Sequence, residues 1–210
     1  MENGAASHER PSADIGTSPR EEPGMDTTLI VPGLHGSGPG HWQSWFEDQI
    51  EGCVRVAQSD WSTPDLPSWS ARLRRGLDRA KGQVFIAAHS FGCLAAVDVA
   101  GDSESSKRIA GMMLVAPADP ARFGLQDRFA GGVLGVHSVL VASTNDDWMS
   151  FESAAGWADT WGSQLVNLGA AGHINVSSGF GPWPRGLEIL RSLRGTASHV
   201  CTIAGTAAIR

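Results

Sequence analysis

The chain has 210 residues, of which 41% are hydrophobic and 18% charged, and its formal net charge is −6. This length and composition are typical of one globular domain with a sizeable core. The acidic balance argues against nucleic acid or an anionic membrane surface as a partner.

Two tails are expected to flank the domain. Residues 1–25 are mainly Gly, Ser, Pro, Glu and Arg, so they have little apolar surface to bury and we expect a disordered segment. Residues 195–210 follow the last clear helical pattern and are expected to be a loose tail. Residues 26–194 then form the domain.

The sequence also bears on where the protein resides. No apolar run approaches the roughly 20 residues that span a bilayer, and the N-terminus lacks the apolar region of a secretory signal. Cys53, Cys93 and Cys201 form neither a disulfide framework nor a zinc-binding pattern. A cytoplasmic location is expected.

Short apolar runs alternate with helical patterns along the domain. The expected strands are Thr28 to Val31, Cys53 to Ala57, Val84 to Ala88, Gly111 to Ala116, Ser138 to Ala142 and Gln164 to Leu168. The expected helices are Gly40 to Gln49, Ser68 to Lys81, Gly92 to Ala100, Ser153 to Gly162 and Pro184 to Leu193, with Ser68 and Pro184 as start signals. This alternation predicts βαβ units and a doubly wound parallel sheet, with the active site at the carboxyl ends of the strands.

The loop after the first strand is rich in glycine. Residues 32–40 read Pro-Gly-Leu-His-Gly-Ser-Gly-Pro-Gly, which allows the backbone to approach a ligand closely. A dinucleotide or phosphate loop would need G-x-G-x-x-G spacing or a following Gly-Lys-Ser/Thr, and neither is present. The loop fits better as a source of backbone N–H groups for a substrate oxygen.

A serine stands between the third strand and the third helix. The strand runs into His89-Ser90-Phe91-Gly92 and a helical pattern follows at once, which is the context of a nucleophile elbow. The tight turn needs small residues two before and two after the serine, and Ala88 stands where glycine is usual. The N–H of Phe91, at the start of the helix, would stabilise an oxyanion. Alternatively, Ser90 only caps the helix.

A serine nucleophile needs an imidazole to take its proton and a carboxylate to orient that imidazole. In this context the chain order is serine, acid, histidine. His173, in the glycine-rich loop after the last strand, is better placed than His137, at the opposite end of a strand, or His199, in the tail. Asp146 and Asp147 follow the fifth strand, and the residues alone leave open which is the acid and whether the pair only forms a turn.

On these motifs the chain resembles the small serine hydrolases typified by retinoblastoma-binding protein 9 and its bacterial relatives, a branch of the α/β-hydrolase superfamily. The resemblance covers about residues 27–194 and rests on Ile30-Val31-Pro32-Gly33, Gly40-His41-Trp42, His89-Ser90-Phe91-Gly92, Ala142-Ser143-Thr144-Asn145-Asp146 and Gly172-His173. It implies a three-layer, compact, capless α/β fold with a roughly six-stranded parallel sheet flanked by helices, and neither cofactor nor metal.

The resemblance also implies site residues. The triad is Ser90, Asp146 and His173, although Asp147 stands where the family usually has proline, so either aspartate could be the acid. Leu34 matches the position that supplies a second oxyanion-hole N–H beside that of Phe91.

These residues predict a carboxylesterase-like serine hydrolase that cleaves a small ester, thioester or activated amide through an acyl-enzyme. Its partner would be a small-molecule acyl substrate. Residues near the predicted loop ends would border the site, or would serve only as packing or surface residues; they are His35, His41, Trp42, Trp148 and Trp183.

Two other classes stay open. One is a protein-interaction module that keeps the hydrolase fold, binds a protein partner and has little catalysis. The other is a dehalogenase or a cofactor-free haloperoxidase on the same fold; the dehalogenase needs aspartate at the position of Ser90. The sequence gives neither the physiological substrate nor the oligomeric state.

Overall fold

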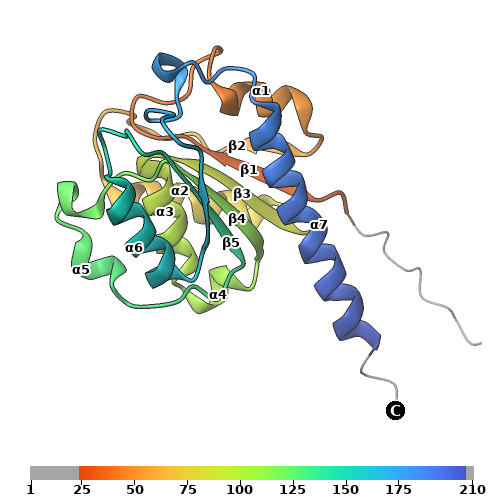
Figure 1. Cartoon of the computed structure of the whole chain (residues 1–210). Coiled ribbons are helices and arrows are strands. Elements are labelled where there is room, and N and C mark those ends of the chain that lie inside the picture. The colour runs from red at the N-terminus through yellow and green to blue at the C-terminus, as the bar shows by residue number, and fades with distance from the viewer. Residues whose placement is uncertain (1–23, 207–210) are drawn as a thin grey trace, which may run out of the picture.

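The computed structural model describes the backbone of residues 24–206 and the side chains of residues 24–196 (Figure 1). Its strands are β1 (Thr27–Val31), β2 (Cys53–Arg55), β3 (Val84–His89), β4 (Ile109–Val115), β5 (Ser138–Ala142) and β6 (Gln164–Asn167). They form a six-stranded sheet in the order β2-β1-β3-β4-β5-β6, and every neighbouring pair is parallel. All carboxyl ends therefore lie along one edge of the sheet.

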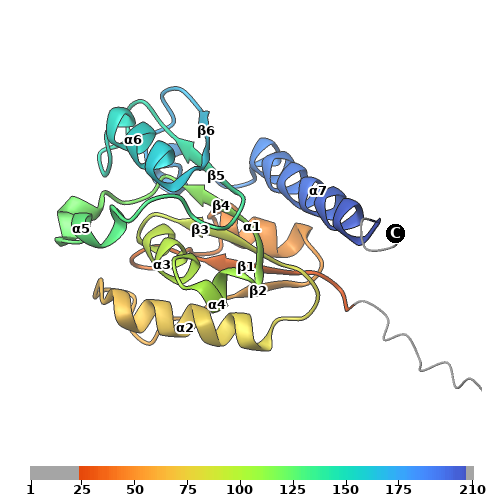
Figure 2. The same cartoon turned by 90° about the horizontal axis from the view of Figure 1, so that it is seen from below.

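Helices cover both faces of this sheet (Figure 2). One face packs against α1 (Trp42–Gln49) and α7 (Pro184–Thr206), and the other against α2 (Leu66–Arg79), α3 (Phe91–Ala100) and α6 (Phe151–Trp161). Shorter helical pieces are α4 (Ser103–Ser106), η1 (Pro120–Phe123), α5 (Gln126–Phe129) and η2 (Val176–Ser178). Because β4 and β5 are joined only by short pieces, no separate cap forms there. The predicted three-layer architecture is confirmed.

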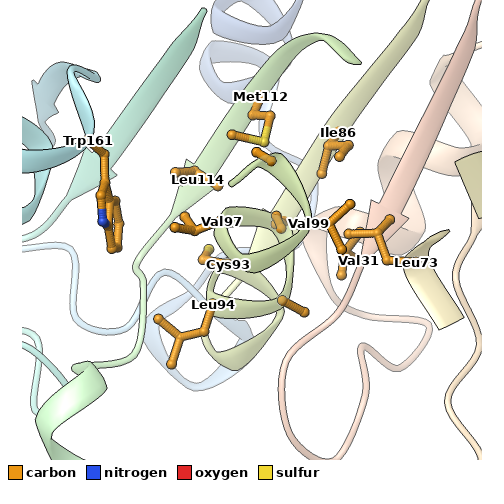
Figure 3. Close-up of a cluster of buried hydrophobic side chains, with 14 of the residues drawn as sticks. Val31, Leu73, Ile86, Cys93, Leu94, Val97, Val99, Met112, Leu114 and Trp161 are labelled. Atoms are coloured by element: carbon orange, nitrogen blue, oxygen red, sulfur yellow. The ribbon is translucent and has the colours of Figure 1, made fainter. Parts of the chain in front are cut away.

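The most deeply buried elements are the central strands of the sheet and helix α3. Strands β1, β3 and β5 are buried throughout, as strands covered on both faces must be. Helix α3 is apolar almost all round, and only Asp98 among its residues is not buried. Its side chains Cys93, Leu94, Val97 and Val99 pack between the sheet and neighbouring helices (Figure 3). The start of α3, which follows the turn at Ser90, is therefore held in place by buried side chains on all sides of the helix.

Several helix ends differ from the expected ones, and two of the differences have a clear physical reason. Helix α2 starts at Leu66 rather than Ser68, because Asp65 is its N-cap and Pro67 is tolerated in the first turn. Helix α7 continues past Leu193 to Thr206, so residues 195–206 are helical and not a loose tail. A glycine inside a helix costs only about 1 kcal/mol relative to alanine, so Gly195 does not end α7.

The remaining tail predictions, for residues 1–23 and 207–210, lie outside the described residues. Between residues 24 and 206, no helix is both long and apolar enough to cross a membrane.

Candidate active site

The turn after β3 has the strained geometry of a nucleophile elbow. Ser90 has φ 53° and ψ −125°, a backbone conformation that non-glycine residues rarely adopt. Its amide donates to the carbonyl of Val115 at 3.1 Å, which ties the turn to β4. Ser90 occupies the N-cap position of α3, but its hydroxyl makes no capping hydrogen bond. The alternative that its side chain only caps the helix is therefore wrong.

The turn also requires a residue without a side chain two positions later. A Cβ atom on Gly92 would lie 2.4 Å from the carbonyl oxygen of Pro32 and 2.5 Å from that of Val31. Real Cβ atoms do not come so close to backbone oxygens, so α3 can approach the end of β1 only with glycine here.

The hydroxyl of Ser90 instead joins a hydrogen-bonded chain. Its Oγ lies 2.9 Å from Nε2 of His173, and Nδ1 of His173 lies 2.9 Å from both carboxylate oxygens of Asp146. The imidazole and carboxylate side chains are 11% and 3% exposed. We assign the proton to Nδ1, because the carboxylate can only accept; Nε2 is then free to accept from the serine hydroxyl.

Only one of the two adjacent aspartates reaches His173. The side chain of Asp147 is exposed, and its backbone carbonyl accepts a hydrogen bond from Arg122. An Asp146 carboxylate oxygen also accepts from the amide of Trp148 at 2.8 Å, which fixes the carboxylate at the start of this loop.

Polar side chains that the sequence analysis did not single out shape the histidine loop. Asn145 Oδ1 accepts from the amide of Gly172 at 2.7 Å, and Ser143 Oγ accepts from that of Ala171 at 2.9 Å. Ser178 Oγ accepts from the amide of His173 at 3.1 Å. The position of Ser143 and Asn145 just before Asp146 is the signal that could have identified two of these residues.

Two buried rings hold consecutive carbonyls of the same loop. His89 Nε2 donates to the carbonyl of His173 at 2.9 Å, and Trp42 Nε1 donates to that of Ile174 at 3.0 Å. Burial, then the neighbouring His173 and His41, lower the pKa of His89 well below its usual range. His89 is therefore neutral at pH 7 and supplies one ring N–H to this bond.

Trp42 and Trp183 do not border the site. Trp42 is fully buried and packs edge-on against Phe46 and Trp183, which is itself buried. The expectation that these tryptophans contact substrate is wrong, because both rings are buried in the apolar core. The ring N–H of Trp42 is already bonded to Ile174. His41 is also buried, and its Nδ1 accepts from the amide of Gln43 as the N-cap of α1.

By contrast, Trp148 and His35 are exposed to solvent. Trp148 is 39% exposed, and its ring centroid lies 5.8 Å from that of His173. The guanidinium carbon of Arg122 lies over the Trp148 ring, 5.5 Å from its centroid. His35 is exposed on the loop after β1, where its amide donates to the carbonyl of Trp61 at 2.7 Å.

The glycine-rich loop passes directly beside the serine. A Cβ atom on Gly33 would lie 2.7 Å from Cβ of Ser90, so the loop backbone approaches Ser90 closely. The amides of His35 and Gly36 are bonded to Trp61 and Gly33, whereas within the described residues the amide of Leu34 has no hydrogen-bond partner. The amide of Phe91 is the first of α3 and lacks a partner inside the helix.

Backbone strain gathers at this edge of the sheet. Among the described residues, the non-glycine residues with positive φ are His35, Ser90, Ala116 and Ile174. They follow β1, β3, β4 and β6, so all four lie beyond carboxyl ends of strands. No group of three or more His, Cys, Asp or Glu side chains in the described part of the chain is placed to hold a metal ion.

Comparisons with known proteins agree with this architecture. A family model described as serine hydrolase matches residues 28–192. No curated protein matches the chain. Among solved structures, a YdeN-like hydrolase from Pectobacterium atrosepticum has 42% sequence identity and a TM-score of 0.78, covering 82% of this chain and 92% of that chain.

Two more distant structures show likeness of fold alone. The ydeN gene product from B. subtilis has 19% identity and a TM-score of 0.67, covering 81% of this chain and 100% of that chain. An alpha-beta serine hydrolase homologue from Coxiella burnetii has 18% identity and a TM-score of 0.58, covering 80% and 83% of the two chains.

Proposed function

The chain belongs to the serine hydrolase family, and from that premise we propose that it cleaves a small ester, thioester or activated amide through an acyl-enzyme on Ser90. The observation that carries this proposal is the hydrogen-bonded chain from Ser90 Oγ through His173 to Asp146. On the motifs quoted above, we further propose that it belongs to the branch typified by retinoblastoma-binding protein 9.

The proposed reaction begins with the serine hydroxyl. Ser90 Oγ attacks the substrate carbonyl carbon while Nε2 of His173 takes the hydroxyl proton. The carboxylate of Asp146 holds the imidazole in the required tautomer and stabilises its cationic form. The imidazolium then gives the proton to the departing alcohol, thiol or amine. Water, activated by the same ring, releases the acyl group as a carboxylic acid and restores Ser90.

Backbone amides would stabilise the negative charge that develops on the carbonyl oxygen. The Leu34 amide is unpartnered within the described residues, and that of Phe91 stands at the N-terminus of α3, where the helix dipole adds to its effect. The closeness of Gly33 to Ser90 supports the placement of the Leu34 loop beside the attacked carbonyl. Removing one such donor typically lowers kcat by about 100-fold to 1000-fold.

The acyl side of the site is proposed to be shallow and bordered by Trp148. Its exposed ring near His173 supports a small apolar substrate group at this position. We also propose a cytoplasmic location, which is supported by Cys53 and Cys93 being free thiols.

The proposal is tested with a fluorophosphonate probe and a series of p-nitrophenyl esters of increasing acyl length. The parent chain should be labelled and should hydrolyse short esters, with the rate falling for longer acyl chains. Ser90→Ala should abolish labelling and lower kcat by several orders of magnitude, because triad members act as a unit. Labelling that persists in Ser90→Ala would contradict the proposal. A parent chain that hydrolyses no ester, but binds a protein partner, would favour the interaction module.

A further inference from the structure

A second cavity lies away from Ser90, between α2 and the edge of the sheet. Its volume is about 490 Å³, which falls in the range of small-molecule sites. Figure 2 shows α2 beside β1 and β2, on the face of the sheet opposite α1. None of its lining residues belongs to the triad or to the loops that surround the triad.

The floor of the cavity is aliphatic. Leu29 of β1, Val54 of β2 and Val56 just after β2 line it, together with Met25 before β1. Val54 is 50% exposed and Met25 57% exposed, so α2 leaves part of the edge strand uncovered. No aromatic side chain is among the lining residues. The floor therefore suits a hydrocarbon chain better than a nucleotide base, which binds by stacking.

A glycine in the last turn of α2, Gly76, keeps this floor open. A Cβ atom on Gly76 would meet Leu29 Cδ1 and Val56 Cγ2 at 3.5 Å, which is ordinary van der Waals contact. Alanine would therefore fit and would favour the helix by about 1 kcal/mol. Since the fold does not require glycine here, its presence is explained better by the space that it leaves.

Five cationic residues line the cavity, and one of them, Arg55, is paired with Glu47. The other four form the rim. Arg72, Arg75 and Arg79 are three or four residues apart and share one face of α2, and Lys81 follows the helix. Within the described residues none of the four has an ion-pair partner, whereas Arg74 of the same helix pairs with Asp98. A local positive patch beside an apolar floor, in a chain with net charge −6, is complementary to a ligand with an anionic head.

We propose that this cavity binds a long-chain carboxylate, with its hydrocarbon chain against Leu29, Val54 and Val56 and its carboxylate against the guanidinium groups of Arg75 and Arg79. Guanidinium groups bind carboxylates through two parallel hydrogen bonds, which gives the head group a preferred position. An added peptide strand is a poorer fit, because β2 has three residues and offers few backbone groups for pairing.

The test is calorimetric titration of the full chain with sodium dodecanoate below its micelle concentration. Dodecanoate should bind, whereas butyrate and dodecyltrimethylammonium should bind at least tenfold more weakly. Gly76→Leu should fill the cavity and weaken dodecanoate binding at least tenfold, while Gly76→Ala, whose single methyl group takes up much less of the floor, should weaken it by less than Gly76→Leu does. Arg75→Gln/Arg79→Gln should also lose at least tenfold, and the remote control Arg185→Gln should not.

Several results would overturn this proposal. They are no binding of dodecanoate, equal binding by Gly76→Leu, and equal binding of the cationic amphiphile. A dimer in sedimentation experiments that Gly76→Leu dissociates would assign the cavity to a second copy of the chain. Hydrolysis of p-nitrophenyl acetate, measured on the same variants, should be unchanged in Gly76→Leu. The cavity proposal and the proposed hydrolase activity can therefore fail separately.

Discussion

Asp146 and Asp147 are adjacent in sequence, yet their carboxylates face different surroundings. That of Asp146 lies against the His173 ring and is almost fully buried, and that of Asp147 is exposed. We expect Asp146→Asn to lower kcat by about 10⁴-fold, because an amide favours the wrong imidazole tautomer. Asp147→Asn, which keeps the backbone bond to Arg122, should stay within about threefold of the parent in kcat/KM for p-nitrophenyl acetate. Equal losses in the two variants would contradict the assignment.

His89 is a positioning residue for the proposed triad, since it holds the backbone of His173 rather than a reacting atom. His89→Ala leaves that carbonyl without its buried donor and allows the loop to shift, and small displacements of a catalytic group cost about 100-fold. We expect kcat to fall by about 10-fold to 100-fold with KM little changed. His89→Gln, which retains an N–H donor, should recover part of the loss. Equal kcat in His89→Ala and the parent, with intact circular dichroism, would exclude this role.

At the residue scale, sequence order was sufficient to find the serine, the histidine and an aspartate pair. It could not separate Asp146 from Asp147, because that choice depends on how the loop after β5 turns. Nor could it show that Trp42 is buried, since an amphipathic helix pattern does not say which ring faces a loop carbonyl. Net charge also says nothing about how charges are distributed, so it could not predict the local group of arginines on α2.

At the scale of elements, the contact between α3 and the end of β1 sets the position of Ser90, the proposed nucleophile. In Gly92→Ala the new Cβ would overlap two backbone carbonyl oxygens, which cannot move aside as a flexible side chain can. We expect at least about 2 kcal/mol of lost unfolding free energy, as overpacking typically costs 1–3 kcal/mol, together with severe loss of esterase activity.

A glycine in another helix provides the matched control for this prediction. A Cβ atom on Gly156 of α6 would meet nothing within 4 Å. Gly156→Ala should therefore raise the unfolding free energy by about 0.5–1 kcal/mol in urea titrations. If Gly92→Ala raised the unfolding free energy as Gly156→Ala does, the close approach of α3 to the end of β1 would not require glycine at position 92.

Element types were predictable because strands and helices differ in the period of their apolar residues. The residues at which helices and strands begin and end were less predictable. The start of α2 depends on a capping bond from Asp65, and the extension of α7 depends on the absence of a strong stop signal after Leu193. The edge strand β2 is also shorter than its apolar run, because pairing with β1 covers only Cys53, Val54 and Arg55.

At the scale of the whole molecule, buried imidazoles should make the fold sensitive to acid. Burial, then the charges of Arg55 and His173, lower the pKa of His41 from 6.5 to about 4. Between pH 6.5 and 4 the unfolded chain takes up a proton that the folded chain does not, so the unfolding free energy falls as the pH falls. This group alone contributes a loss on the order of 3 kcal/mol across that window.

His41→Asn isolates this contribution, because asparagine can still accept the capping hydrogen bond from Gln43 but does not titrate. The unfolding free energy of this variant, measured in urea at a series of pH values, should depend less steeply on pH between 6.5 and 4. The exposed His137 provides a control in His137→Asn. Identical slopes for both variants would contradict burial as the cause.

The residues with positive φ beyond the carboxyl ends of the strands differ in whether they can be replaced to make the protein more heat-resistant. His35 has φ 65°, a conformation that glycine or asparagine adopts at little cost, so substitution there would relieve strain while leaving the proposed nucleophile in place. At Ser90 no such exchange exists, because replacing the serine with glycine or asparagine removes the hydroxyl that we propose as the nucleophile. Stabilising substitutions are therefore expected to be accepted in the loop after β1, whereas the strain at Ser90 must be kept if the proposed activity is to be kept.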